Sequence, residues 1–220
     1  MIRTLIFDWD GTLHDTGRLY GRAFRKAYRW LVEQGHAPER EYRDAEVTCY
    51  LGMNARDMWD CFMPHLPRDV KNQASSIIGG EMIAEIDAGR AVLYPGAVQA
   101  LNQLKAQGYE MVILSNCKRA YLQAHRKAFR LEQWFTGFYC CEDFDFAPKE
   151  EIFTALRPNH PADYAVIGDR ASDLQVALTH HLCFVGCAYG FGGTGELAAA
   201  TRIARSPAEI PGYIAALQRR

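Results

Sequence analysis

Several features that would indicate particular partners are missing from the sequence. The 220 residues include 25 Lys and Arg against 26 Asp and Glu, so the chain lacks the basic surplus typical of proteins that bind nucleic acid or anionic membranes. No apolar stretch approaches the roughly 20 residues that a membrane span requires. The N-terminal residues run straight into a strand-like pattern, without the charged, apolar and cleavage regions of a secretory leader. We therefore expect a cytoplasmic protein that binds neither nucleic acid nor membranes.

The cysteines also lack a pattern. Seven are present, an odd number at irregular spacing. Cys183 and Cys187 stand four positions apart, but no second pair of Cys or His follows at zinc-finger spacing. Internal repeats and low-complexity tracts are absent as well, and 49% apolar with 23% charged residues is an ordinary composition for a globular protein. We interpret the cysteines as reduced, small hydrophobic side chains.

From Tyr94 onward, strand-like and helix-like segments alternate. Buried strands are predicted at 109–116, 163–169 and 182–190, and helices at 95–107, 171–179 and 206–218. The last helix has Ser206 as its expected N-cap and Pro207 as its first residue. Apolar strands separated by helices are typical of a parallel sheet with both faces covered. The sequence therefore predicts an α/β doubly wound fold.

The early part of the chain departs from this alternation. The segment between Asp8 and Tyr109 is far longer than the dozen or so residues that a parallel crossover needs. Helical patterns occupy 17–35, 55–66 and 71–89. We therefore expect a helical domain at 16–89, inserted between 1–15 and 90–220 of the core. Because ligands bind at the carboxyl ends of parallel strands, an insertion that leaves the core there is placed to cover a site.

The stretch IFDWDGTLHDT (6–16) places Asp8 and Asp10 at the end of the first apolar run, with Gly11 directly after them. Carboxylates and glycine weaken a strand interior, so the strand must end here. Asp-Gly is a common turn, which gives Asp10 a purely structural interpretation. A catalytic interpretation needs partners elsewhere in the chain.

Such partners follow the later strands. They are Ser115 and Asn116, Lys149, Asp169 and Asp173. Clustered carboxylates repel one another unless a cation neutralises them, and Mg²⁺ prefers hard oxygen ligands. A lysine, a serine hydroxyl and backbone N–H groups suit the oxygens of a phosphate, and a carboxylate can accept a phosphoryl group. The set predicts a phosphoryl-transfer site with Mg²⁺ as cofactor, for which the turn interpretation of Asp10 is insufficient.

Together these residues resemble the motifs of the haloacid dehalogenase-like superfamily. DWDGT (8–12) fits its DxDGT motif, LSN (114–116) its second motif and GDRASD (168–173) its GDxxxD motif. The resemblance covers nearly the whole chain and is strongest to the phosphoglycolate phosphatase and β-phosphoglucomutase group. That group has a Rossmann-like core, a helical cap inserted after the first motif and a YPG element, here 94–96, where the chain returns to the core.

The resemblance implies a role for each carboxylate. Asp8 would be the nucleophile, forming an aspartyl-phosphate, and a metal ligand. Asp10 would be the general acid and base, with its backbone carbonyl on the metal. Asp169 would bind Mg²⁺, and Asp173 would support it.

The resemblance also implies the phosphate-binding groups. Ser115 and Lys149 would bind the transferring phosphoryl group, and Gly11 and Asn116 would donate backbone N–H groups to it. Relatives usually have Lys-Pro at the third motif, whereas this chain has APK (147–149), with the proline first. Lys149 keeps the role as the only lysine after Lys127. The alternative is a surface charge in the first turn of a helix.

Two arginines of the expected cap are possible substrate contacts. Arg18 begins a basic stripe on the first cap helix, which is either a solvated face or a region that attracts an anionic substrate. Arg56 lies in a loop that faces the core in relatives, and it is otherwise an exposed arginine at a helix start.

The leading functional hypothesis is a phosphatase acting on a small phosphorylated metabolite, similar to phosphoglycolate or a sugar phosphate. A phosphomutase of the β-phosphoglucomutase type would use the same aspartates, but Thr12 after Asp10-Gly11 favours the phosphatase. A dehalogenase is less consistent with an acid at Asp10. A non-catalytic binding protein is the last alternative, since every acidic site residue is present. We expect a monomer or a homodimer.

Overall fold

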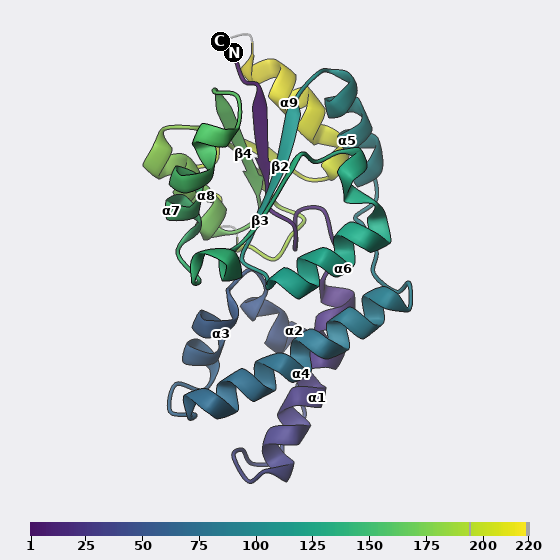
Figure 1. Cartoon of the computed structure of the whole chain (residues 1–220), viewed down its shortest axis with the longest axis vertical. Coiled ribbons are helices and arrows are strands. Elements are labelled where there is room, and N and C mark those ends of the chain that lie inside the picture. The colour runs from purple at the N-terminus through teal and green to yellow at the C-terminus, as the bar shows by residue number, and fades with distance from the viewer. Residues whose placement is uncertain (194, 219–220) are drawn as a thin grey trace.

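The computed structural model describes residues 1–193 and 195–218. Within these residues the core is a parallel sheet in the order β3-β2-β1-β4-β5-β6. The strands are β1 Thr4–Phe7, β2 Glu110–Ser115, β3 Gly137–Cys140, β4 Tyr164–Gly168, β5 Cys183–Cys187 and β6 Arg202–Ala204. Helices cover both faces of the sheet (Figure 1). The predicted α/β doubly wound fold is confirmed, although the short edge strands β3 and β6 were not predicted.

Each face of the sheet has its own apolar layer. The covering helices are α5 Ala97–Ala106 and α9 Ile210–Leu217, seen to the right of the sheet in Figure 1, and α7 Lys149–Leu156 and α8 Ala171–His180 to its left. Because strand side chains alternate between faces, Leu5 and Phe7 join one cluster with Leu101, whereas Ile6 joins the other with Phe153. Burial on both faces explains why β1 and β4 are almost wholly apolar.

The C-terminal helix begins later than predicted. Pro207–Glu209 form a 3₁₀ turn, and α9 starts at Ile210. Ser206 makes no side-chain capping hydrogen bond, so the predicted cap is wrong. Pro211 lies in the first turn of α9, where a missing N–H costs nothing. This second proline, rather than Pro207, marks the start of the α-helix.

The segment 16–89 is helical throughout most of its length. It contains α1 Gly17–Glu33, α2 Asp44–Val47, α3 Ala55–Phe62 and α4 Arg68–Asp87. These helices gather beyond one end of the sheet, opposite the chain termini (Figure 1). Phe24 and Leu31 of α1 share a buried cluster with Ile78 of α4. The division of the chain into an inserted cap and a core stays a prediction. None of the described helices combines the length and the apolar character needed to cross a membrane.

Candidate active site

The ends of three adjacent strands bring the predicted polar residues together. β1 lies between β2 and β4, with Phe7 opposite Ile113 and Ile167. Asp8 therefore leaves β1 at the edge where β2 ends at Ser115 and β4 is followed by Asp169. The site is a direct result of the sheet register, because parallel strands present their carboxyl ends on one side.

Lys149 joins this cluster from the first turn of α7. Its Nζ atom donates hydrogen bonds to Asp8 Oδ1 at 2.7 Å and to Asp173 Oδ1 at 2.6 Å. Only 3% of Lys149 is exposed, which excludes the surface-charge alternative. Pro148 occupies the N-cap position of α7 and Glu151 is exposed. The reversed Pro-Lys order therefore still delivers Lys149 to the carboxylates.

The cluster carries more negative than positive charge. Oxygens of Asp8, Asp169 and Asp173 lie within 4.8 Å of one another, and all three residues are buried. Three carboxylates and the Lys149 ammonium give a formal charge of −2. Burial, and then the charge of Asp173, raise the pKa of Asp8 well above its usual range and that of Asp169 to about 7. Burial opposes the charged form of Lys149, but Asp173 and Asp8 outweigh it and raise its pKa.

This donor set fits a divalent cation. Three buried carboxylates offer hard oxygen ligands of the kind that Mg²⁺ binds, and a charge of +2 would neutralise the formal −2 of the cluster. Asp173 is already engaged, since its second oxygen accepts the Arg170 backbone N–H at 3.0 Å. Asp8 accepts the Lys149 ammonium on Oδ1 and has no hydrogen bond to Oδ2 among the described residues, so this carboxylate keeps the most lone pairs for a cation.

Two groups that the sequence did not indicate orient Asp169. The Thr12 hydroxyl donates to Asp169 Oδ1 at 3.0 Å, and the Phe191 backbone N–H donates to Oδ2 at 2.7 Å. Thr12 stands inside the DWDGT motif, so its proximity could have been anticipated. Phe191 belongs to the glycine-rich turn after β5, which was expected beside the active site, but nothing in the sequence indicates its hydrogen bond to Asp169.

The position of Gly11 differs in part from expectation. Its φ is +84°, and a Cβ there would lie 2.3 Å from Asp169 Oδ2, so only glycine fits the close approach. Its backbone N–H donates to the His14 carbonyl at 3.0 Å. That N–H is therefore occupied within the turn, and donation from Gly11 to phosphate stays a prediction. The Gly11 N–H thus serves as a hydrogen-bond donor within the turn from Trp9 to His14.

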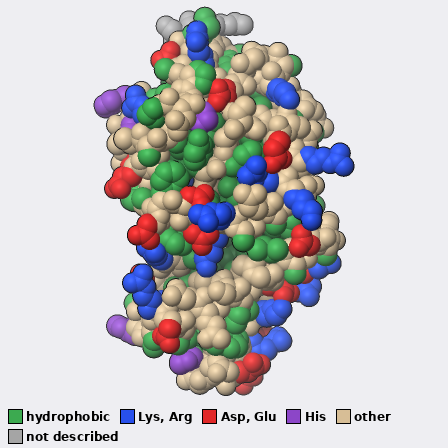
Figure 2. Space-filling view, viewed as in Figure 1, with side chains coloured by type: hydrophobic (Ala, Val, Ile, Leu, Met, Phe, Trp, Pro, Cys, Tyr) green, Lys and Arg blue, Asp and Glu red, His purple; other side chains and the backbone are tan. Residues whose placement is uncertain are grey.

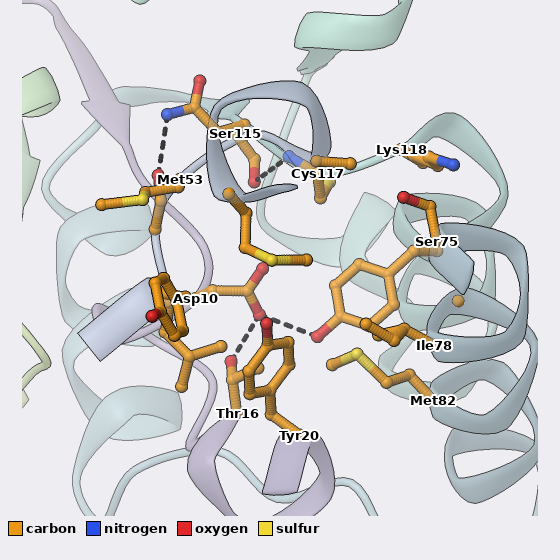
Figure 3. A pocket seen from close by; sticks show the side chains of 18 of the residues that line it. Asp10, Thr16, Tyr20, Met53, Ser75, Ile78, Met82, Ser115, Cys117 and Lys118 are labelled. Atoms are coloured by element: carbon orange, nitrogen blue, oxygen red, sulfur yellow. Dashed lines mark hydrogen bonds between the residues drawn. The ribbon is translucent and has the colours of Figure 1, made fainter. Parts of the chain in front are cut away.

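Asp10 accepts several hydrogen bonds on a single carboxylate oxygen. Oδ1 accepts the hydroxyl of Thr16 and that of Tyr121, the latter at 2.8 Å, and His14 Nδ1 lies 3.2 Å away. Figure 3 shows Asp10 at the centre of the pocket with its bond to Thr16. Burial opposes the ionised form, but the hydrogen bonds and charges from His14 and its neighbours outweigh it and lower the pKa of Asp10. The carboxylate is thus held as an oriented base.

Two buried histidines support Asp10 from behind. The rings of His14 and His125 are 4.3 Å apart between centroids, and both residues are fully buried beside Trp9. The Nε2 atoms of both have no hydrogen-bond partner among the described residues. Burial, reinforced by His14, lowers the pKa of His125 to about 3. The sequence gives no signal for this pair, because His125 comes from α6 (Arg119–Phe129), more than a hundred positions away from His14.

A pocket opens above these carboxylates, between the sheet edge and the helices of 16–89. Its floor includes Asp8, Asp10, Ser115 and Asn116. The Asn116 side chain donates to the Gly52 carbonyl at 2.8 Å, which ties the loop before α3 to the core. The predicted nucleophile, acid and phosphate-binding serine therefore face one space.

Arg18 and Arg56 do not line this pocket. Arg18 bonds Asp15 at 2.7 Å, and Arg56 bonds Asp145 at 2.8 Å while stacking on Phe146. Further along the stripe on α1, Arg22 pairs with Glu81. Figure 2 shows blue and red side chains interleaved along the lower right edge of this view. In this structure the suggested substrate contacts of Arg18 and Arg56 are replaced by ion pairs within the protein.

Curated proteins of similar sequence include two phosphatases. A phosphoglycolate phosphatase from Rhodobacter capsulatus is 27% identical over 118 residues, which are 53% of this chain and 51% of that protein. A glyceraldehyde 3-phosphate phosphatase from Methanopyrus kandleri is 28% identical over 118 residues, 50% of this chain and 49% of the other. The chain therefore matches about half the length of these relatives.

Solved structures match the whole fold. A predicted phosphatase from Clostridium acetobutylicum has a TM-score of 0.84 at 22% identity, covering 98% of this chain and 99% of the other. CbbY from Rhodobacter sphaeroides in complex with phosphate has a TM-score of 0.77 at 21% identity, covering 96% of each. The model of the haloacid dehalogenase-like hydrolase family matches residues 2–181. Taken with the motif residues at the strand ends, this match shows that the chain belongs to the haloacid dehalogenase-like hydrolase family.

Proposed function

We propose that this protein is a Mg²⁺-dependent phosphatase that hydrolyses a small phosphomonoester through an aspartyl-phosphate on Asp8. The observation that carries the proposal is the position of Asp8, which hydrogen-bonds Lys149, neighbours Asp169 and faces the same pocket as Asp10. The phosphatases named among the relatives support it. The bound Mg²⁺, held by Asp8, the Asp10 carbonyl and Asp169, would neutralise the carboxylate cluster and the phosphate oxygens.

In the first step an Asp8 oxygen attacks phosphorus, and the bond from phosphorus to the substrate oxygen breaks. Lys149 and Ser115 hold the phosphoryl oxygens, and Asp10 gives its proton to the departing oxygen. A phosphate dianion bound beside Asp10 raises the pKa of Asp10 by like-charge repulsion. Asp10 can therefore carry a proton when substrate is bound, although its carboxyl is ionised in the free site.

In the second step Asp10, now ionised, takes a proton from water. The hydroxide oxygen attacks phosphorus, and the bond from phosphorus to the Asp8 oxygen breaks. Phosphate is released and the Asp8 carboxylate is restored. Thr16 and Tyr121 orient the same Asp10 oxygen through both steps. We also propose that residues 16–89 form a cap over this site, and that the substrate is a small phosphorylated metabolite.

Phosphate release from p-nitrophenyl phosphate by the purified chain tests the function. We expect release that needs Mg²⁺ and no primer. Turnover only with a hexose bisphosphate primer would indicate a phosphomutase instead, and fluoride release from fluoroacetate would indicate a dehalogenase. No release under any of these conditions would contradict the proposal.

A further inference from the structure

The wall of the pocket opposite Asp10 is apolar. Figure 3 shows Tyr20, Met53, Ile78 and Met82 around the carboxylate, and Tyr50 and Met58 complete this side. These six residues, here called the apolar wall, come from α1, the loop before α3, α3 itself and α4. The leaving group of a substrate whose phosphate lies at Asp8 extends into the pocket that these residues line, because Asp8 and Asp10 form its floor.

The apolar wall offers little to a charged leaving group. Among the described residues that line the pocket, Lys118 is the one cationic side chain, and it lies at the pocket edge beside Ser75 (Figure 3). Two arginines outside the pocket lining are already paired, Arg56 with Asp145 and Arg170 with Glu196. A carboxylate buried against these six side chains, beyond the reach of Lys118, would be left without a partner, which is costly.

Some hydroxyl groups around the pocket are already committed, whereas those of Tyr20 and Tyr50 have no hydrogen-bond partner among the described residues. Ser75 accepts the Trp59 indole N–H at 2.6 Å, and Tyr121 donates to Asp10. A sugar needs a partner for each hydroxyl that it buries, since an unmatched hydroxyl loses its bonds to water. Methionine side chains, in contrast, adapt to apolar groups of varied shape.

We propose that the preferred substrate is the phosphate monoester of an uncharged, apolar alcohol, whose alkyl or aryl group packs against the apolar wall. This inference rests on the proposed phosphatase function and specifies its substrate class. It departs from the phosphoglycolate-like and sugar-phosphate-like substrates that the family resemblance implies, because phosphoglycolate places a carboxylate where the wall is apolar.

Primary alkyl phosphates test the inference without changing the leaving-group chemistry. We expect kcat/KM to rise by at least tenfold from ethyl to hexyl phosphate, since even one of the four added methylenes, once packed in an apolar pocket, contributes about tenfold. We expect 6-phosphonooxyhexanoate, in which a carboxylate replaces the terminal methyl of hexyl phosphate, to lose that gain. A flat alkyl series, or a preference for the carboxylate, would overturn the inference.

A charge placed in the wall provides the matched variant. Met53 is 37% exposed, so Met53→Lys can be accommodated without burying the ammonium. We expect it to lower kcat/KM for hexyl phosphate and to raise it for 6-phosphonooxyhexanoate. Leu178→Lys makes the same change at an exposed position of α8 outside the pocket, and should alter neither value. Equal effects of both variants, or none from Met53→Lys, would contradict a contact with the wall.

Acetyl phosphate separates this inference from the function on which it rests. Hydrolysis of acetyl phosphate by the wild-type protein, together with a preference for phosphoglycolate, would overturn only the substrate class. Failure to hydrolyse acetyl phosphate and every alkyl phosphate would overturn the phosphatase proposal itself.

Discussion

The Nζ atom of Lys149 lies 2.7 Å from Oδ1 of Asp8, although 141 positions separate the two residues in the chain. Both side chains are almost completely buried, at 2% and 3% exposure. The same ammonium bonds Asp173, so it holds together carboxylates that would otherwise repel one another. Lys149 therefore stabilises the carboxylate cluster, and this contribution can be measured.

Replacement of Lys149 tests this stabilisation. Lys149→Met leaves buried carboxylates without their partner, and breaking a buried pair in this way typically costs about 3–5 kcal/mol of unfolding free energy. Urea denaturation in EDTA at pH 7 measures the loss. Lys127→Met, at an exposed position of α6, should change stability by about 0.5 kcal/mol or less. Equal stability of the two variants would show that Lys149 does not hold the cluster together.

The charge of the carboxylate cluster predicts a dependence on Mg²⁺. We expect Mg²⁺ to raise the melting temperature and to be required for phosphate release, because it neutralises the formal −2 of the cluster. Ca²⁺ should not replace it in catalysis, since its larger and more variable coordination occupies the oxygen of Asp8 that must attack. Asp169→Asn should weaken both effects of Mg²⁺. Full activity in EDTA would contradict the proposed cofactor.

Loss of the acid at position 10 should slow catalysis and leave the fold intact. Asp10→Asn keeps the shape of the side chain but cannot transfer the proton, so kcat for alkyl phosphates should fall by about 10²–10⁴-fold. The control is Asp15→Asn, since the Asp15 carboxylate bonds Arg18 outside the pocket. Steady-state kinetics and circular dichroism give the two readouts. Near wild-type turnover by Asp10→Asn would mean that Asp10 is only a turn residue.

His125 predicts a specific pH dependence of stability. Its folded-state pKa of about 3 is below the value of about 6.5 expected in the unfolded chain, so the unfolded state binds more protons at acid pH. The stabilisation is complete above pH 6.5 and is lost progressively as the pH falls toward 3. By pH 5 the loss from this one group is about 2 kcal/mol.

His125→Phe removes that titration while keeping a ring against Trp9. Its unfolding free energy should fall less than that of the wild type between pH 7 and pH 5, as measured by urea denaturation at each pH. His65→Phe, at an exposed position, should retain the wild-type slope. Identical slopes for all three proteins would show that His125 is not held neutral in the folded state.

The parts of the site that lie on strand ends were predictable from the sequence. Apolar runs identify β1, β2 and β4, and the parallel arrangement then brings Asp8, Ser115 and Asp169 to one edge. Tyr121 and Phe191 were not predictable, because their contacts depend on how α6 and the turn after β5 pack against the sheet edge.

The apolar lining of the pocket could not be predicted from the sequence pattern either. Met82 and Ile78 recur at helical spacing on α4, which is as typical of a helix packed into the core as of one lining a pocket. The basic stripe on α1 was ambiguous for a related reason. Its neutralisation by Glu81 depends on the packing of α1 against α4, which periodicity does not specify.

The central claim is that Asp8 accepts the phosphoryl group, and acid quenching with a ³²P-labelled phosphomonoester tests it most directly. We expect covalent label that is stable to acid, is released by hydroxylamine and maps to the peptide containing Asp8. Asp10→Asn should accumulate this label with a good leaving group, because water is no longer activated. Asp8→Asn should carry none. Phosphate release without label on Asp8, or turnover that persists in Asp8→Asn, would contradict the account.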